Sequence, residues 1–246
     1  MIKREAIISG LRVTYLISSE FNPEKALVFL PGWKSPVDLF CKIIGDIPNL
    51  LAINLPGWGG SEIPQGTWGL IEYAKLVQEF LQKLEINNPI LIGHSVGGAV
   101  AVEYLNNGGR AKKLILIGGA IIRERLGRSQ ILFLAAKTFR FLFPFVNKKW
   151  RQRLAGKSLS VDYIEAGEME DIYKRLISED KQEAFSKLDL PTILIWGKND
   201  KATPYSQAER LKNLNSQVIL ETITEAGHYC FLDKPVEFRK IFFKYL

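Results

Sequence analysis

The chain has 246 residues, of which 47% are apolar and 24% are charged, and its formal net charge at pH 7 is +7. This length suffices for one α/β domain with a large core, and the composition excludes a disordered or low-complexity chain. Its two cysteines lack metal-ligand spacing and do not make a disulfide framework.

The apolar stretches are not those of a secreted or membrane-spanning protein. Residues 1–18 do not form a secretion signal, because Glu5 interrupts the charged region and the apolar runs are short. The most apolar later stretch, 131–146, contains two basic residues and Pro144, so it is too short and too charged to span a bilayer. We therefore expect a cytoplasmic location and no transmembrane segment.

The first part of the chain alternates strand and helix patterns. Segments 5–10 and 11–18 alternate apolar and polar residues around a turn, which predicts an antiparallel hairpin. The runs at 26–30 and 50–55 are short, almost continuously apolar and followed by Pro-Gly. Such runs are typical of strands buried on both faces of a parallel sheet.

Between 67 and 84, apolar residues recur on one helical face, which predicts an amphipathic helix with Thr67 available as its N-cap. A strand at 89–93 leads into a helix that begins at Ser95, and a further strand is predicted at 112–119.

This rhythm stops over residues 120–187, which are basic and rich in aromatic residues and are predicted to be helical. It then resumes with two strands and two helices, predicted at 192–197, from 204, at 217–223 and at 236–246. Alternating strands and helices predict a mostly parallel α/β sheet. We expect 1–119 and 188–246 to form this core, with 120–187 as a helical cap inserted after the sixth strand, over the carboxyl ends where such sheets bind ligands.

The stretch from Gly93 to Gly97 reads Gly-His-Ser-Val-Gly and matches the G-x-S-x-G pattern between a strand and a helix. This context favours a strained turn that exposes Ser95 as a nucleophile, because small residues two positions before and after it are needed where the backbone is crowded. The turn would also aim the backbone N–H of Val96 at a developing oxyanion.

These features resemble the α/β-hydrolase superfamily, in particular small capped serine hydrolases, over almost the whole chain. The resemblance implies an eight-stranded sheet and a triad in the chain order serine, acid, histidine. His228, in "EAGHYCFLDKP", is the histidine that satisfies this order, and Asp200, in "WGKNDKATP", stands where the family carries its acid. Glu124 is the alternative acid. His94 is interpreted as a packing and hydrogen-bonding residue.

The second oxyanion donor is expected from the backbone N–H of Trp33, in "LPGWKSP", which resembles the family's His-Gly loop with Pro31 in place of the histidine. Asn54 replaces the aspartate of another family turn, "NLPGWGGSEIP", which we interpret as a fold signature. The resemblance implies acyl transfer to water without a metal or an organic cofactor, on a small-molecule ester.

Three functions stay open at this point: a carboxylic-ester hydrolase, a carbon–carbon bond hydrolase of ring-fission type with the same triad, and a non-catalytic small-molecule binder of this fold. Basic residues gather between 119 and 157, where Glu124 is the single acidic residue. They could form a solvated helical face, or they could meet an anionic substrate, a membrane surface or an acidic carrier protein. Esterases that act on acyl-carrier-protein methyl esters have a similar basic cap. No nucleic-acid module accompanies the cluster, so nucleic acid is not expected as a partner.

Overall fold

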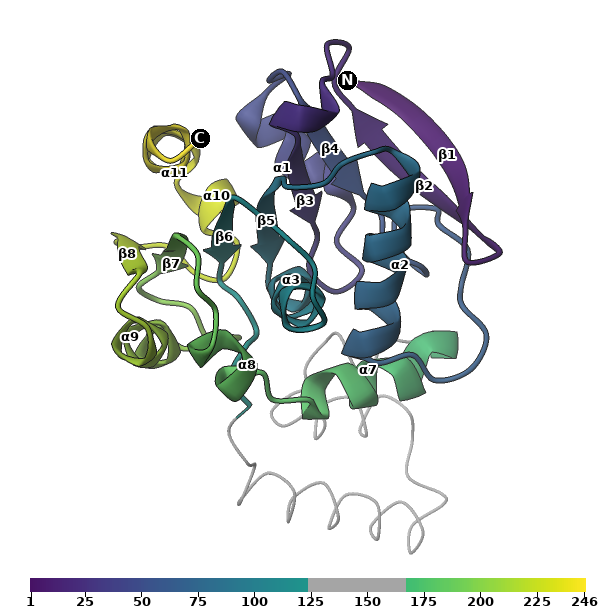
Figure 1. The fold of residues 1–246 in the computed structure, drawn as a ribbon. Helices are drawn as coiled ribbons and strands as arrows, with labels where there is room; N and C mark the ends of the chain where they lie inside the picture. The colour runs from purple at the N-terminus through teal and green to yellow at the C-terminus, as the bar shows by residue number, and fades with distance from the viewer. Residues whose placement is uncertain (124–166) are drawn as a thin grey trace, which may run out of the picture.

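The computed structural model describes residues 1–123 and 167–246, and within these ranges eight strands form one sheet in the order β1-β2-β4-β3-β5-β6-β7-β8 (Figure 1). The pairs β1–β2 and β2–β4 are antiparallel, and every other neighbouring pair is parallel. The strands are β1 (Ile2–Ile8), β2 (Leu11–Ile17), β3 (Leu27–Leu30), β4 (Leu50–Ile53), β5 (Ile90–His94), β6 (Lys113–Ile117), β7 (Thr192–Gly197) and β8 (Val218–Ile223). The predicted hairpin and mostly parallel sheet are confirmed.

Helices cover both faces of the sheet, which explains why the central strands are apolar without alternation. Every residue of β3, β4 and β7 is buried. One face is covered by α2 (Leu70–Lys83), α3 (Val96–Asn106), α8 (Gln182–Ser186) and α9 (Tyr205–Leu214). The other is covered by α1 (Val37–Ile44), α10 (Cys230–Asp233) and α11 (Pro235–Lys244) (Figure 1). Helix α7 (Glu170–Ser178) and two short 3₁₀ turns, Pro23–Lys25 and Gly167–Met169, complete the described elements.

Aromatic packing holds α1 and α11 to the sheet. Phe29 of β3 stacks on Phe40 of α1 with ring centroids 3.9 Å apart, and Phe40 meets Phe238 and Phe242 of α11 edge-on. Edge-to-face and offset contacts of this kind add about 0.5–1.5 kcal/mol per pair beyond the burial of area. This cluster fixes the carboxyl end of β3, from which the Trp33 loop departs.

The predicted cap of α2 is wrong: the helix begins at Leu70, and Gly69 is its N-cap instead of Thr67. The Gly69 N–H donates to Glu72 Oε2 at 2.6 Å, and the Leu70 N–H lies 3.3 Å from the Glu179 carboxylate. Acidic side chains near a helix start accept hydrogen bonds from its unpaired N–H groups and interact favourably with the positive end of the helix dipole. The threonine is therefore not needed as a cap.

Two described parts of the range 120–187 pack on the core. Ile121 is fully buried in the main apolar cluster, and Phe185 of α8 joins the same cluster. Helix α7 lies beside the start of α2, where Arg175 pairs with Glu72 (Figure 1), and Tyr173 packs on Trp33 with ring centroids 4.9 Å apart. Among the described helices, none is long and apolar enough to cross a membrane.

Arg123 does not belong to a solvated helical face. It lies in the segment that follows β6, its N–H donates to Asp180 Oδ2 at 2.6 Å, and its guanidinium donates to the Leu176 carbonyl at 3.2 Å. Burial lowers the pKa of Arg123 from its ordinary value, although Tyr173 and two carboxylates oppose the shift. The other basic residues of the cluster, Arg125 to Lys157, and the alternative acid Glu124 lie outside the described residues.

Candidate active site

The turn between β5 and α3 has the strained geometry that the Gly-His-Ser-Val-Gly pattern predicts. Strand β5 ends at His94, α3 begins at Val96, and Ser95 between them has φ 51° and ψ −118°. Positive φ is uncommon for a residue with a side chain and marks a functional turn when the surroundings enforce it.

The surroundings enforce this turn through backbone crowding. A Cβ on Gly93 would lie 2.5 Å from the Cα of Gly98, and a Cβ on Gly97 would lie 2.2 Å from the carbonyl oxygen of Leu30. Both neighbours are main-chain atoms that cannot turn aside, so glycine is required at 93 and 97. Gly97 thus packs α3 directly on the end of β3.

Asp200 and His228 meet at the carboxyl edge of the sheet from loops that follow β7 and β8. His228 Nδ1 donates to Asp200 Oδ2 at 2.8 Å. The Asp200 side chain is completely inaccessible to solvent, whereas that of His228 remains 17% exposed. A proton held on Nδ1 leaves Nε2 of the neutral ring as its basic nitrogen.

Four donors surround the Asp200 carboxylate. Oδ1 accepts from the N–H groups of Ala202 and Thr203 at 2.8 and 2.9 Å, and Oδ2 accepts from His228 and from the Thr203 hydroxyl, both at 2.8 Å. Burial alone would raise the pKa of Asp200, but the hydrogen bond and charge of His228 and the hydrogen bonds of Thr203 outweigh burial and lower the pKa below its ordinary value. The acid is therefore held ionised.

His94 is confirmed as a packing and hydrogen-bonding residue. Its ring is 1% exposed, lies 5.0 Å from the Tyr229 ring and 5.2 Å from the Phe231 ring, and donates from Nε2 to the carbonyl of His228 at 3.2 Å. Burial lowers the pKa of His94 to about 3, with the nearby His228 acting in the same direction. The neutral ring therefore connects the Ser95 turn to the loop that carries His228.

Ser95 directly follows His94 in the chain and forms no hydrogen bond with the pair of Asp200 and His228 in the described ranges. The ring centroids of His94 and His228 are 4.9 Å apart. Within the described residues the Ser95 hydroxyl forms no hydrogen bond. Serine–histidine hydrogen bonds are often long in the absence of substrate.

The loop after β3 lies directly against the Ser95 turn. A Cβ on Gly32 would be 2.7 Å from His94 Nδ1 and 3.2 Å from Ser95 Cβ, so the loop approaches as closely as glycine permits. The Trp33 N–H donates to no described backbone carbonyl. The Trp33 indole packs on Trp58 and Tyr173. This packing and the close approach of Gly97 to the main chain of Pro31 hold the loop, in which Pro31 stands in place of the histidine of the resembled family.

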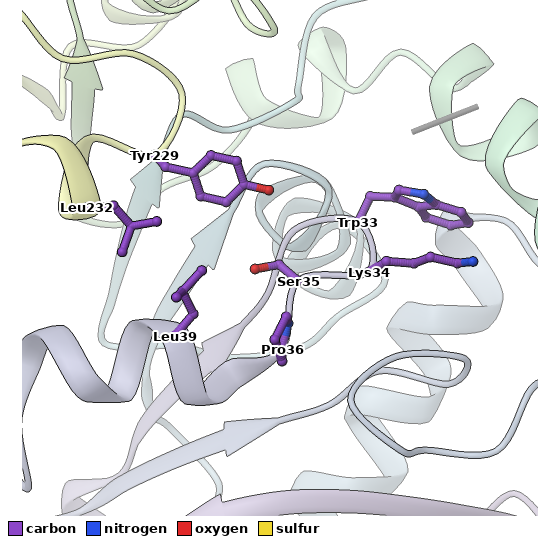
Figure 2. Close-up of a pocket in the computed structure, with 7 residues that line it drawn as sticks. All are labelled: Trp33, Lys34, Ser35, Pro36, Leu39, Tyr229 and Leu232. Carbon is purple, nitrogen blue, oxygen red and sulfur yellow. The ribbon is translucent and has the colours of Figure 1, made fainter. Parts of the chain in front are cut away.

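A hollow of about 370 Å³ adjoins the Trp33 loop, and Trp33 is the one lining residue that was singled out from the sequence. Figure 2 shows Tyr229 and Leu232 on one side of it, with Ser35, Pro36 and Leu39 on the other; Trp33 and Lys34 complete the lining. Tyr229 directly follows His228, so the hollow lies next to the histidine loop. Its walls are part polar and part apolar, as is usual for small-molecule sites.

Asn54 lies in the turn after β4 and stabilises the fold, as predicted. Its Nδ2 donates to Thr14 Oγ1 at 2.9 Å and to the Gly59 carbonyl at 3.3 Å, and its Oδ1 accepts from the Val37 N–H at 3.3 Å. An aspartate could accept from the Val37 N–H but could not donate to the Gly59 carbonyl. In the described ranges, no group of three or more His, Cys, Asp or Glu side chains could hold a metal ion.

Comparisons with known proteins agree with this architecture. Residues 27–241 match the model of the alpha/beta hydrolase family, so the chain belongs to that family and has the hydrolase fold. An esterase from Exiguobacterium antarcticum superposes with a TM-score of 0.76 at 23% identity, over 99% of each chain.

Two relatives carry names that point to different hydrolase reactions. A Mycoplasma genitalium protein whose name places it among esterases and lipases is 29% identical over 92% of this chain and 90% of its own length. A 2-hydroxy-6-oxononadienedioate/2-hydroxy-6-oxononatrienedioate hydrolase of Burkholderia vietnamiensis is 24% identical over 80% of this chain and 76% of its own length.

Proposed function

We propose that the protein is a serine hydrolase that cleaves a carboxylic ester through an acyl-enzyme on Ser95. The observation that carries the proposal is the combination of a strained, glycine-enclosed serine turn with a histidine hydrogen-bonded at 2.8 Å to a buried aspartate. A serine hydroxyl is a weak nucleophile near neutral pH and needs such a base beside it. The esterase and lipase names among its relatives support the same chemistry.

In the proposed reaction, Ser95 attacks the ester carbonyl while His228 Nε2 takes the hydroxyl proton. The backbone N–H groups of Trp33 and Val96 receive the oxyanion, and Val96 is suited to this because the first N–H groups of a helix have no partner inside it. His228 then protonates the leaving alcohol and activates a water molecule that releases the acid. Asp200 orients the imidazole and stabilises its positive charge.

The test is turnover of p-nitrophenyl esters of increasing acyl length by the wild type, Ser95→Ala and His228→Ala. We expect turnover by the wild type and a loss of at least about a thousandfold in kcat for both variants, because each removes a member of one chemical unit. Equal turnover by the wild type and Ser95→Ala would overturn the proposal.

Labelling identifies the nucleophile independently of the substrate. A fluorophosphonate should modify Ser95 in the wild type and should not modify the Ser95→Ala variant. Ser35 is a suitable control, because it lies in the neighbouring hollow and is also a serine near the Trp33 loop. Labelling that persists in Ser95→Ala and disappears in Ser35→Ala would place the nucleophile elsewhere.

The second candidate function is hydrolysis of a carbon–carbon bond in a ring-fission product with the same triad, which the name of the Burkholderia relative favours. A ring-fission dienoate absorbs strongly in the visible range, so its loss can be followed directly. If the protein consumes such a dienoate with a higher kcat/KM than any p-nitrophenyl ester, the second function replaces the first. A chain that binds either compound without turnover would be the non-catalytic binder of this fold.

A further inference from the structure

Thr203 lies at the centre of the polar contacts that hold Asp200 and His228. It is 3% exposed, in the loop between β7 and α9, and its hydroxyl contacts three groups. The oxygen is 2.8 Å from Asp200 Oδ2, 3.1 Å from the Gly118 carbonyl oxygen and 3.3 Å from His228 Nδ1. None of these partners is close to Thr203 in sequence except Asp200.

A threonine hydroxyl has one proton and two lone pairs, so these three contacts restrict one another. When the hydroxyl donates to Asp200 Oδ2, it stabilises the carboxylate and holds its plane. When it turns to the Gly118 carbonyl, a lone pair faces the Nδ1 proton of His228, but no proton then separates its oxygen from Asp200 Oδ2 at 2.8 Å, so donation to Asp200 is favoured. In both arrangements the Nδ1 proton stays between the imidazole and its acid.

Two further observations show that this place is built closely around the hydroxyl. The Thr203 N–H donates to Asp200 Oδ1, so one residue supplies a donor to each carboxylate oxygen. Gly118 has φ 52°, and a Cβ there would lie 3.2 Å from both Asp200 Oδ2 and His228 Nδ1. The end of β6 therefore approaches the pair closely enough for its carbonyl to take part.

We infer that Thr203 is a positioning residue of this hydrolase, whose hydroxyl fixes the orientation of Asp200 and His228 by joining the ends of β6 and β7. The inference rests on the proposed triad chemistry. Thr203 does not touch the substrate in this account, so its loss should slow the chemical steps and leave substrate binding unchanged.

The test compares Thr203→Val with Thr203→Ser. Valine keeps the branched shape and the N–H that bonds Asp200 but lacks the hydroxyl, whereas serine keeps the hydroxyl. We expect kcat per titrated active site to fall about 10- to 100-fold in Thr203→Val, since small misplacement of a catalytic group has effects of this size. KM should stay the same, and Thr203→Ser should recover most of kcat.

Thr192→Val is the matched control. Thr192 is fully buried in β7 and its hydroxyl donates to the Leu190 carbonyl at 3.1 Å, but it lies at the opposite end of the strand. This variant loses a buried hydroxyl of the same kind and should keep the wild-type kcat. The inference is overturned if Thr203→Val keeps the wild-type kcat, if Thr203→Ser loses as much as valine, or if Thr192→Val loses as much as Thr203→Val.

A spectroscopic measurement separates this inference from the proposed function. The chain has two histidines, and His94 carries its proton on Nε2. In the His94→Gln background labelled with ¹⁵N-histidine, His228 is the remaining histidine, so its Nδ1 proton resonance can be assigned. That resonance should move in Thr203→Val and stay in place in Thr192→Val. An unmoved resonance in Thr203→Val overturns the positioning role. Because no turnover is measured, this holds even if Ser95→Ala shows the esterase proposal to be wrong.

Discussion

Two loops at the carboxyl edge of the sheet are held in place by different physical means. The Ser95 turn is shaped by exclusion: main-chain atoms of Gly98 and Leu30 occupy the space that side chains at 93 and 97 would need. The Asp200 loop is shaped by attraction, because four hydrogen bonds converge on one carboxylate. The first loop should therefore fail when atoms are added, and the second when a charge or a hydrogen-bond donor is removed.

Substitutions in the two loops should also differ in whether they change stability or chemistry. A crowded turn transmits a substitution into the packing of α3 on β3, so its variants should change the free energy of unfolding. The hydrogen-bonded loop holds groups at the reacting edge, so its variants should change kcat first. We expect variants at Asp200, Gly97 and His94 to reveal this difference, with effects that decrease in that order.

Asp200→Asn should lower kcat on the order of 10³- to 10⁴-fold, because the neutral amide neither stabilises the imidazolium nor holds the histidine tautomer. Initial rates with a p-nitrophenyl ester measure the effect. Asp189→Asn is the control, since Asp189 is exposed before β7 and accepts a hydrogen bond from Gln217 at the other edge of the sheet. A loss in Asp200→Asn no larger than in Asp189→Asn would refute the role of Asp200.

Gly97→Ala should destabilise the fold by about 3 kcal/mol or more, because its Cβ would overlap main-chain atoms of Leu30 and Pro31 that cannot repack. Urea unfolding measures the change. At Gly119 an added Cβ would meet its nearest neighbour at an ordinary 3.4 Å, so Gly119→Ala should have little effect. Comparable stability of the two variants would show that crowding does not shape the turn.

His94→Gln should flatten the dependence of stability on pH. The pKa of His94 falls from 6.5 to about 3 on folding, so between these values the unfolded chain binds a proton that the folded chain does not. The free energy of unfolding should thus decrease as pH falls below about 6.5, by up to ~1.4 kcal/mol per pH unit for this group. Glutamine does not titrate and removes this contribution.

Urea unfolding of the wild type and His94→Gln at several pH values above 4.5 measures this slope. The lower limit keeps Asp200 out of the measurement. Because its pKa is lowered in the folded protein, its contribution to the free energy of unfolding is lost only in more acidic solution. Equal slopes in the two proteins would show that His94 does not titrate as its burial requires. Esterase activity of His94→Gln near neutral pH should persist, since the ring is not the proposed base.

Local patterns predicted most of the fold and the Ser95 turn, whereas the resemblance to the α/β-hydrolase superfamily implied Asp200 and His228. Apolar runs located the central strands, because strands buried on both faces need no polar side chain. The glycines around Ser95 located the turn, because a strained backbone restricts residue type within five positions. Patterns of this kind depend on the nearest neighbours in the chain, which a sequence displays directly.

The predictions that failed or were missed depend on distant residues. The start of α2 is stabilised by Glu179, which is 109 positions from Leu70, so Thr67 looked like the better cap. For Arg123 a solvated basic face was one of the open interpretations, and the structure instead shows its guanidinium bonded to a carbonyl of α7. Thr203 follows Asp200 closely, but only Gly118 and His228, from other parts of the chain, make its hydroxyl significant.

The amino-acid sequence by itself therefore determined the α/β alternation, the serine turn and the order of serine, aspartate and histidine. Only the tertiary structure decided which atoms meet at the carboxyl edge. His228 Nδ1 donates to Asp200, His94 donates to the His228 carbonyl, and the Thr203 hydroxyl contacts the Gly118 carbonyl after β6. The physical reason is that parallel strands bring loops that are far apart in the chain to one edge of the sheet. There, differences of a few tenths of an ångström in donor–acceptor distance decide which hydrogen bonds form.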